Sequence, residues 1–211
     1  MEIYKLIYSP IEVNTYILVD QSGDCAIIDC GCYNRDEFKR FERFISEKKI
    51  NPVLVLNTHC HLDHIFGNTF IYEKYGLKPF SNEFEETNRK NSVQHAMLFG
   101  LTMVQPPEPE GFIIDKQLIT FGTTILVAIH VPGHAPGSLA FYNEKNGCVF
   151  TGDALFSGSI GRTDLPGGDY ETLLNSIRSR LFILPLSTVV YPGHGNETTI
   201  DREIKSNPFF S

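Results

Sequence analysis

Seven histidine and aspartate side chains follow apolar runs of this sequence, at positions where they could bind metal ions. They come after the runs 53–56, 125–131, 148–150 and 189–191, and five of them belong to the chain's 7 histidines. Imidazole nitrogens and carboxylate oxygens are ligands for Zn, Fe and Mn, and such ions can activate water for hydrolysis. We therefore predict a metal site formed by His59, His61, Asp63, His64, His134, Asp153 and His194.

The segment from His59 to His64 contains four of these residues. Alternate side chains of an extended segment point to one side, so His59 and His61 can bind one cation. Asp63 and His64 begin the next predicted helix and turn toward a second cation. Asp63 could also cap that helix, since aspartate is favoured at helix N-termini, and the two roles are compatible. We expect two divalent metal ions, with zinc as the first choice and iron or manganese as alternatives, because these ligands accept all three.

The apolar runs before these residues read as strands that alternate with helical segments. In α/β proteins, ligand residues gather at strand ends, where side chains from distant parts of the chain meet. Apolar periodicity and turn residues predict helices over 34–49, 63–75, 83–100 and 170–182. They predict strands over 3–7, 15–19, 25–29, 53–56, 113–114, 124–131, 139–142, 148–150 and 188–191. The turn Asn146-Gly147 should join two of these strands as a hairpin. We expect one α/β domain over residues 1–211, with a mixed sheet.

Composition narrows the classes of partner. A net charge of −7 argues against nucleic acid, which requires clustered lysine and arginine. No apolar run approaches the roughly 18 residues of a membrane span, and the N-terminus lacks a signal-peptide pattern. The 5 cysteines follow no disulfide framework, so free thiols in the cytoplasm are the plain reading. We expect a small-molecule substrate and no membrane partner, and the oligomeric state stays open.

Four short motifs, taken in order along nearly the whole chain, resemble the metallo-β-lactamase superfamily. They are HxHxDH at 59–64, PGH at 132–134, GD at 152–153 and PGH at 192–194. The resemblance implies an αββα sandwich of two mixed β-sheets flanked by helices, with the metal site at one edge. It implies one metal held by His59, His61 and His134, a second held by Asp63, His64 and His194, and Asp153 as the bridge between them.

Residues 151–169 and 191–200 are similar to the glyoxalase II-type branch, the hydroxyacylglutathione hydrolases, in a short form without the C-terminal helical domain. This resemblance implies cleavage of a thioester such as a hydroxyacylglutathione, with a metal-bridging hydroxide as the nucleophile. Asp63 and Asp153 would be catalytic because they bind the metals that hold this hydroxide. Arg162 matches a basic position that contacts a substrate carboxylate in that branch, although an ordinary surface ion pair is an equal alternative.

Three further residues have two readings each. Asp29 ends a predicted strand, where it could orient a ligand histidine or serve as a turn residue before Gly31. His95 lies on a predicted helix, where it could be structural or line a substrate cleft. Cys60 lies between two predicted ligands, where it could act as a thiolate, but its side chain should point opposite to His59 and His61, which favours packing in the core.

Other functions fit the same ligands less well. His59, His134 and Asp153 alone would form a two-histidine, one-carboxylate iron site, as in the persulfide dioxygenases of the superfamily, which also carry a GRTD segment. True β-lactamases do not usually bridge their metals with an aspartate at the position of Asp153. A purely structural zinc site would use four closed ligands, often cysteines. A thioester is favoured over an amide because a thiolate, with a thiol pKa of about 8.5, leaves with little help from an acid.

Overall fold

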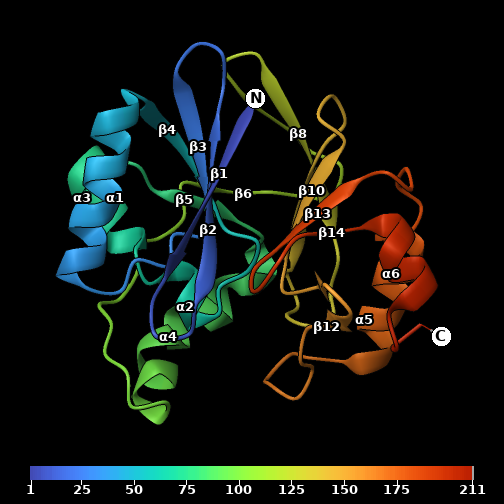
Figure 1. The fold of residues 1–211 in the computed structure, drawn as a ribbon. Helices are drawn as coiled ribbons and strands as arrows, with labels where there is room; N and C mark the ends of the chain where they lie inside the picture. The colour runs from blue at the N-terminus through green and yellow to red at the C-terminus, as the bar shows by residue number, and fades with distance from the viewer. Residues whose placement is uncertain (211) are drawn as a thin grey trace.

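The computed structural model describes residues 1–210, and its centre is a pair of six-stranded β-sheets packed face to face (Figure 1). Helices lie against the outer face of each sheet, so the layers run α, β, β, α. Both sheets combine parallel and antiparallel pairs. The predicted αββα sandwich of two mixed sheets is therefore confirmed.

The first sheet is built from the N-terminal half of the chain. Its strands are adjacent in sequence order, antiparallel from β1 to β3 and parallel from β3 to β6. They are β1 (Glu2–Tyr8), β2 (Val13–Val19), β3 (Asp24–Ile28), β4 (Asn51–Leu56), β5 (Pro79–Ser81) and β6 (Gly111–Phe112).

The second sheet is built from the C-terminal half, in the order β14-β13-β10-β9-β8-β7. Only β10 and β13 run parallel, and the remaining pairs are antiparallel. The strands are β7 (Leu118–Phe121), β8 (Thr124–His130), β9 (Leu139–Asn143), β10 (Cys148–Gly152), β13 (Val189–Pro192) and β14 (Thr198–Thr199). The predicted hairpin joins β9 to β10, and a small separate hairpin pairs β11 (Leu155–Phe156) with β12 (Ser159–Ile160).

Three apolar clusters hold the layers together. The cluster between the sheets includes Leu18, Phe141 and Phe150. One outer cluster packs α1 (Arg35–Lys48) and α3 (Asn68–Tyr75) on the first sheet. The other packs three helical elements on the second sheet: α5 (Tyr170–Ser176), its π-helical continuation η2 (Ile177–Leu181) and α6 (Ile200–Ser206). The short helices α2 (Leu62–Ile65) and η1 (Glu83–Glu85), with the longer α4 (Glu86–Leu98), lie near one end of the sandwich.

Within residues 1–210, no helix is long and apolar enough to cross a membrane.

The first helix confirms the prediction over 34–49, and its ends follow from two capping residues. The Asn34 side chain accepts hydrogen bonds from the backbone N–H groups of Asp36 and Glu37, which would otherwise lack partners. Lys49 ends the helix in the left-handed conformation. Phe41 and Ile45, one turn apart, are the buried residues of the face that packs on the first sheet.

The prediction of one continuous helix over 63–75 was wrong, because α2 and α3 are separated at Gly67. The Gly67 N–H donates to the Cys30 carbonyl, and a Cβ at this position would lie 2.4 Å from Cys30 Sγ. Only glycine allows the chain to pass so close to Cys30. The break lets α2 turn its first residues toward the strand ends.

The smallest elements were also missed or misplaced. The strand predicted at 113–114 lies at 111–112, and β5, β7, β11, β12, β14 and α6 were not predicted. Strands of two to four residues are too short to show an alternating pattern, and α6, with seven residues, is too short for a clear helical period.

Candidate metal centre

The seven predicted residues lie just after four strands and meet where the two sheets end. β4 of the first sheet leads into the segment from His59 to His64, while β8, β10 and β13 of the second sheet lead to His134, Asp153 and His194. Their ligand atoms form three overlapping groups within 4.8 Å: His59, His61 and His134; His59, His64 and Asp153; and Asp63, His64 and His194.

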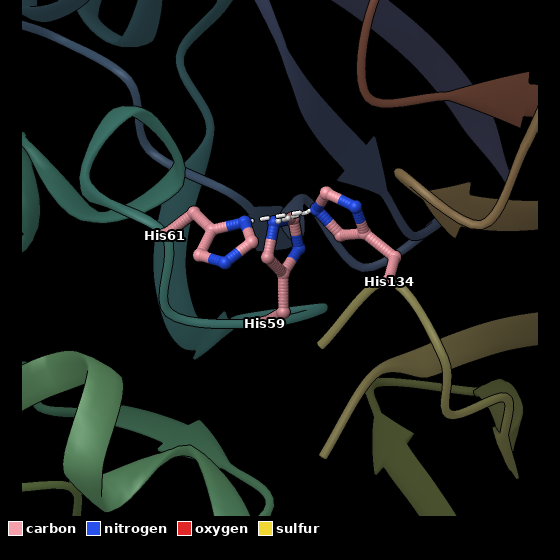
Figure 2. A group of neighbouring side chains, drawn as sticks. All are labelled: His59, His61 and His134. Carbon is pink, nitrogen blue, oxygen red and sulfur yellow. Dashed lines mark hydrogen bonds between the residues drawn. The ribbon is translucent and has the colours of Figure 1, made fainter. Parts of the chain in front are cut away.

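The first group consists of three imidazoles whose nitrogens point at one another (Figure 2). His61 Nδ1 lies 2.9 Å from His134 Nε2, which in turn lies 3.2 Å from His59 Nε2. His59 and His134 are buried, and His61 faces the cleft described below. Three converging imidazole nitrogens form the donor set of a transition-metal site.

The group of Asp63, His64 and His194, called the second group from here on, pairs a carboxylate with two imidazoles. His194 Nε2 lies 3.1 Å from Asp63 Oδ2, and His64 Nε2 lies 3.6 Å from the same oxygen. Asp63 does not cap α2, because His61 occupies the N-cap position. The alternative reading of Asp63 as a helix cap is therefore wrong.

Asp153 lies between the two groups. Its Oδ1 is 3.3 Å from His64 Nε2, while its Oδ2 is 3.7 Å from His134 Nε2 and 3.6 Å from His194 Nε2. One carboxylate thus faces members of both groups, which is the placement that a bridging ligand requires.

Two buried atoms in this cluster fit a metal ion. Neither His64 Nε2 nor Asp153 Oδ1 makes a hydrogen bond to any of the described residues, although both are inaccessible to solvent. A buried polar atom without a partner costs about 1–3 kcal/mol, and a bound cation would satisfy both atoms. The residues present therefore fit a divalent metal.

The charges of the cluster point the same way. Burial lowers the pKa of His59 well below its usual value and lowers the pKa of His61 to about 3, so both are neutral imidazoles. Burial would lower the pKa of His64 too, but the carboxylates of Asp153 and Asp63 outweigh it and raise this pKa well above the ordinary range. The second group therefore favours a positive charge, which a metal ion can supply in place of the proton.

The outward nitrogens of the histidines are held by hydrogen-bonding partners that set their orientation. His134 Nδ1 lies 2.7 Å from the Arg162 carbonyl, and His194 Nδ1 lies 3.2 Å from the Glu12 carbonyl. A histidine that donates one ring N–H to an acceptor presents its other nitrogen to a metal. Asp29 plays this part for His64, with 2.8 Å between Asp29 Oδ2 and His64 Nδ1.

Asp29 takes the first of the two roles left open by the sequence, because its carboxylate faces a histidine of the cluster. Its φ of 54° places it in the left-handed region just after β3, and its carboxylate also accepts from the backbone N–H and the hydroxyl of Thr58. The residue before His59 and the ring of His64 are thereby tied to one buried acid.

The glycine of each PGH motif allows a close approach. Gly133 has a φ of 128°, and a Cβ there would lie 2.3 Å from the Leu173 backbone nitrogen. A Cβ on Gly193 would lie 2.1 Å from Asp153 Oδ1, inside the metal cluster itself. These glycines let the ligand histidines follow their strands without displacing α5 or Asp153.

Glu85 is a residue of the site that the sequence analysis missed. It is fully buried and accepts hydrogen bonds from Cys60 N at 2.8 Å, Gly137 N at 2.7 Å and Asn88 Nδ2 at 3.0 Å. Cys60 lies between His59 and His61, and Gly137 follows His134 by three residues. One carboxylate therefore joins both loops that carry the first group. A lone glutamate in a helical stretch gives no local signal of this role.

Replacing Glu85 with glutamine is expected to destabilise the protein by about 2–3 kcal/mol and to weaken metal binding about tenfold. Glutamine keeps the size of the side chain but turns an amide N–H₂ toward donors that need an acceptor. Denaturant unfolding and metal titration would measure both effects. Glu83→Gln is the matched control, because Glu83 is the exposed first residue of η1, the short helix that Glu85 ends. Equal behaviour of the two variants would show that Glu85 does not position the loops.

A cleft of about 440 Å³ opens onto the metal cluster. His61, Asp63, His134, Asp153 and His194 form part of its wall, and His95 lines it too. Arg162 also lies in the cleft, but its guanidinium donates to both carboxylate oxygens of Asp164 at 2.7 Å. Cys60, by contrast, is buried and belongs to none of the metal-binding groups.

Comparison with known proteins places this geometry in a wider family. The family model described as "Metallo-beta-lactamase superfamily" matches residues 9–194. The chain is 36% identical over 205 residues to the hydroxyacylglutathione hydrolase GloC of Haemophilus influenzae, covering 94% of this chain and 92% of that protein. Two solved structures match with a TM-score of 0.89 each. The BLEG-1 B3 metallo-beta-lactamase is 30% identical, with 100% of this chain and 100% of that chain covered. TTHA1623, in a di-iron-bound form, is 32% identical, with 98% of this chain and 99% of that chain covered.

Proposed function

Because this chain belongs to the metallo-beta-lactamase superfamily, we propose that it is a two-metal hydrolase of glyoxalase II type that cleaves thioesters. The observation that carries the proposal is the position of Asp153, whose two oxygens face the imidazoles of both groups. A single-metal enzyme would need only one of these groups. Zinc remains the first choice of metal, and iron is an alternative that agrees with the di-iron form of TTHA1623.

The residues divide the work of the site. His59, His61 and His134 would hold one metal, Asp63, His64 and His194 the other, and Asp153 both. Two such cations, when bound, supply an activated water as nucleophile and a Lewis acid for the substrate carbonyl oxygen. The protein's own part is to keep the ligand atoms in place through Asp29, Glu85 and the backbone carbonyls of Arg162 and Glu12. The cleft then brings the substrate to them.

The side chains around the cleft favour a thioester over an amide. Apart from the seven proposed ligands, the titratable residues that line it are His95 and Arg162. Arginine is always protonated and is not a practical acid at neutral pH, which leaves His95 as the one candidate proton donor among these described residues. A departing amine needs a proton donor, whereas a thiolate leaves with little help. The similarity to GloC supports the same substrate class.

Hydrolysis of lactoylglutathione by the purified, metal-loaded protein is the direct test. Release of free thiol, lost after chelation and restored by metal, is the expected result. Two parallel assays distinguish the alternatives: oxygen uptake with glutathione persulfide, and ring opening of a β-lactam. The first alternative would use the iron triad of His59, His134 and Asp153, and the second follows from the likeness to BLEG-1. Persulfide oxidation or β-lactam cleavage without thioester cleavage would refute the proposal.

A further inference from the structure

The wall of the cleft away from the metal cluster is apolar. It is formed by Ile11, Leu62, Leu98, Phe99, Leu165 and Pro166. Three of these residues keep large parts of their side chains exposed: Leu98 is 83% exposed, Phe99 55% and Ile11 39%. A gathering of exposed apolar side chains at the rim of a pocket marks a surface that a ligand covers.

The apolar rim comes from the end of α4. Leu98 is the last residue of this helix and Phe99 its C-cap, and Gly100 follows with a φ of 70°. The helix thus stops where its last apolar side chains reach the cleft. Met97, the preceding residue, is 69% exposed but does not line the cleft.

Away from the metal cluster, the described residues of the cleft offer no free lysine or arginine to an acidic substrate group. Arg162 is the only lysine or arginine lining it within residues 1–210, and both Asp164 oxygens already occupy its guanidinium. Asp63 and Asp153 add two negative charges at the metal cluster, where two bound divalent cations would outweigh them and attract the thioester carbonyl. A carboxylate on the substrate would therefore have to compete with Asp164 for the Arg162 guanidinium.

We propose that the cleft selects thioesters that carry an uncharged apolar chain, which lies along Leu98 and Phe99 while the thioester carbonyl faces the metal cluster. This inference rests on the proposed thioesterase function and narrows its substrate class. The chain could be attached on the acyl side or on the thiol side. The shared chemistry is an alkyl chain of several carbons, and the Arg162–Asp164 pair disfavours one that ends in a carboxylate.

Two substrate series test the inference on the metal-loaded protein. The first extends the acyl group from acetyl to octanoyl on N-acetylcysteamine, and the second extends the thiol from ethanethiol to octanethiol on an acetyl group. Because each buried methylene adds favourable transfer free energy, kcat/KM should rise about tenfold or more along at least one series. A flat or falling profile in both series, with acetyl thioesters still cleaved, would overturn the inference and leave the proposed function intact. Cleavage of no thioester would overturn both.

Leu98→Gln should reduce the ratio of kcat/KM between the longest and shortest substrates about threefold or more. Met97→Gln is the matched control, because it makes the same kind of change at the neighbouring exposed position outside the cleft. If both variants changed this ratio of kcat/KM equally, or if neither changed it, the placement of the alkyl chain along α4 would be contradicted.

Asp164→Asn tests the charge part of the inference. It frees Arg162, so kcat/KM for the succinyl thioester should rise about threefold or more relative to the butanoyl thioester of equal length. Asp201→Asn removes an exposed acid from another ion pair, with Lys205, and controls for the change in net charge. An unchanged succinyl-to-butanoyl ratio in the Asp164 variant would show that the ion pair does not set this selectivity.

Discussion

Replacement of Asp153 with asparagine is expected to lower kcat/KM for thioester cleavage by about 10³-fold or more and to reduce the metal bound per chain. The physical reason is that one carboxylate faces both groups, with its oxygens 3.7 Å from His134 in the first group and 3.3 Å from His64 in the second. Asparagine has the same shape but carries no charge and has only one acceptor oxygen. An N–H₂ turned toward either group would repel the cation there.

Elemental analysis of the dialysed protein, combined with kinetics, would measure this effect. Circular dichroism would show whether the variant keeps its fold, and Asp201→Asn is the control for loss of one exposed negative charge. An Asp153→Asn protein that retains two metals and full activity would show that Asp153 does not bridge the site. Loss of one metal alone would place Asp153 in a single group.

Asp29→Asn is expected to weaken metal binding at the second group about 10–100-fold, with a comparable fall in kcat/KM. Asn tolerates the left-handed backbone that Asp29 adopts at a φ of 54°, so the turn should survive. The variant loses the anionic acceptor for His64 Nδ1, which lies 2.8 Å from Asp29 Oδ2. The ring of His64 would then be less firmly oriented and less basic toward a metal.

Competition between the protein and a chelator of known affinity would measure the loss at each metal site. Asp24→Asn, at the start of the same strand, controls for the removal of a carboxylate near β3. An Asp29 variant that binds both metals as tightly as the wild type would reduce Asp29 to a turn residue. A variant that loses stability but not metal affinity would lead to the same conclusion.

The cluster of histidine and aspartate side chains was predictable because the chain has only 7 histidines and five of them recur just after predicted strands. Histidine or aspartate follows each of the four strands β4, β8, β10 and β13. Their side chains are far apart in the sequence, and the fold brings them into one cluster. Strand ends meet at a common edge, so the position of a residue along its strand already predicts its neighbourhood.

The supports of the cluster were harder to find because they act through tertiary contacts. Glu85 stands in a helical stretch without any motif, yet its carboxylate accepts hydrogen bonds from two distant loops. The break at Gly67 depends on the carbonyl and sulfur of Cys30, which lie 37 residues earlier in the sequence. The sequence left open whether Arg162 contacts a substrate carboxylate or forms an ordinary ion pair, and its partner Asp164 is known only once the loop conformation is known.

The most direct test of a two-metal hydrolase is a titration of the metal-free protein with zinc, and in parallel with ferrous iron under anaerobic conditions, while thioester cleavage is followed. We expect activity to rise until about two equivalents are bound per chain, because Asp153 lies between the first and second groups and faces His134 of one and His64 of the other. Full activity at one equivalent would contradict a two-metal mechanism. Binding of one iron per chain, with dioxygen consumed as a glutathione persulfide is oxidised and no thioester cleaved, would assign the site to the dioxygenase reaction instead.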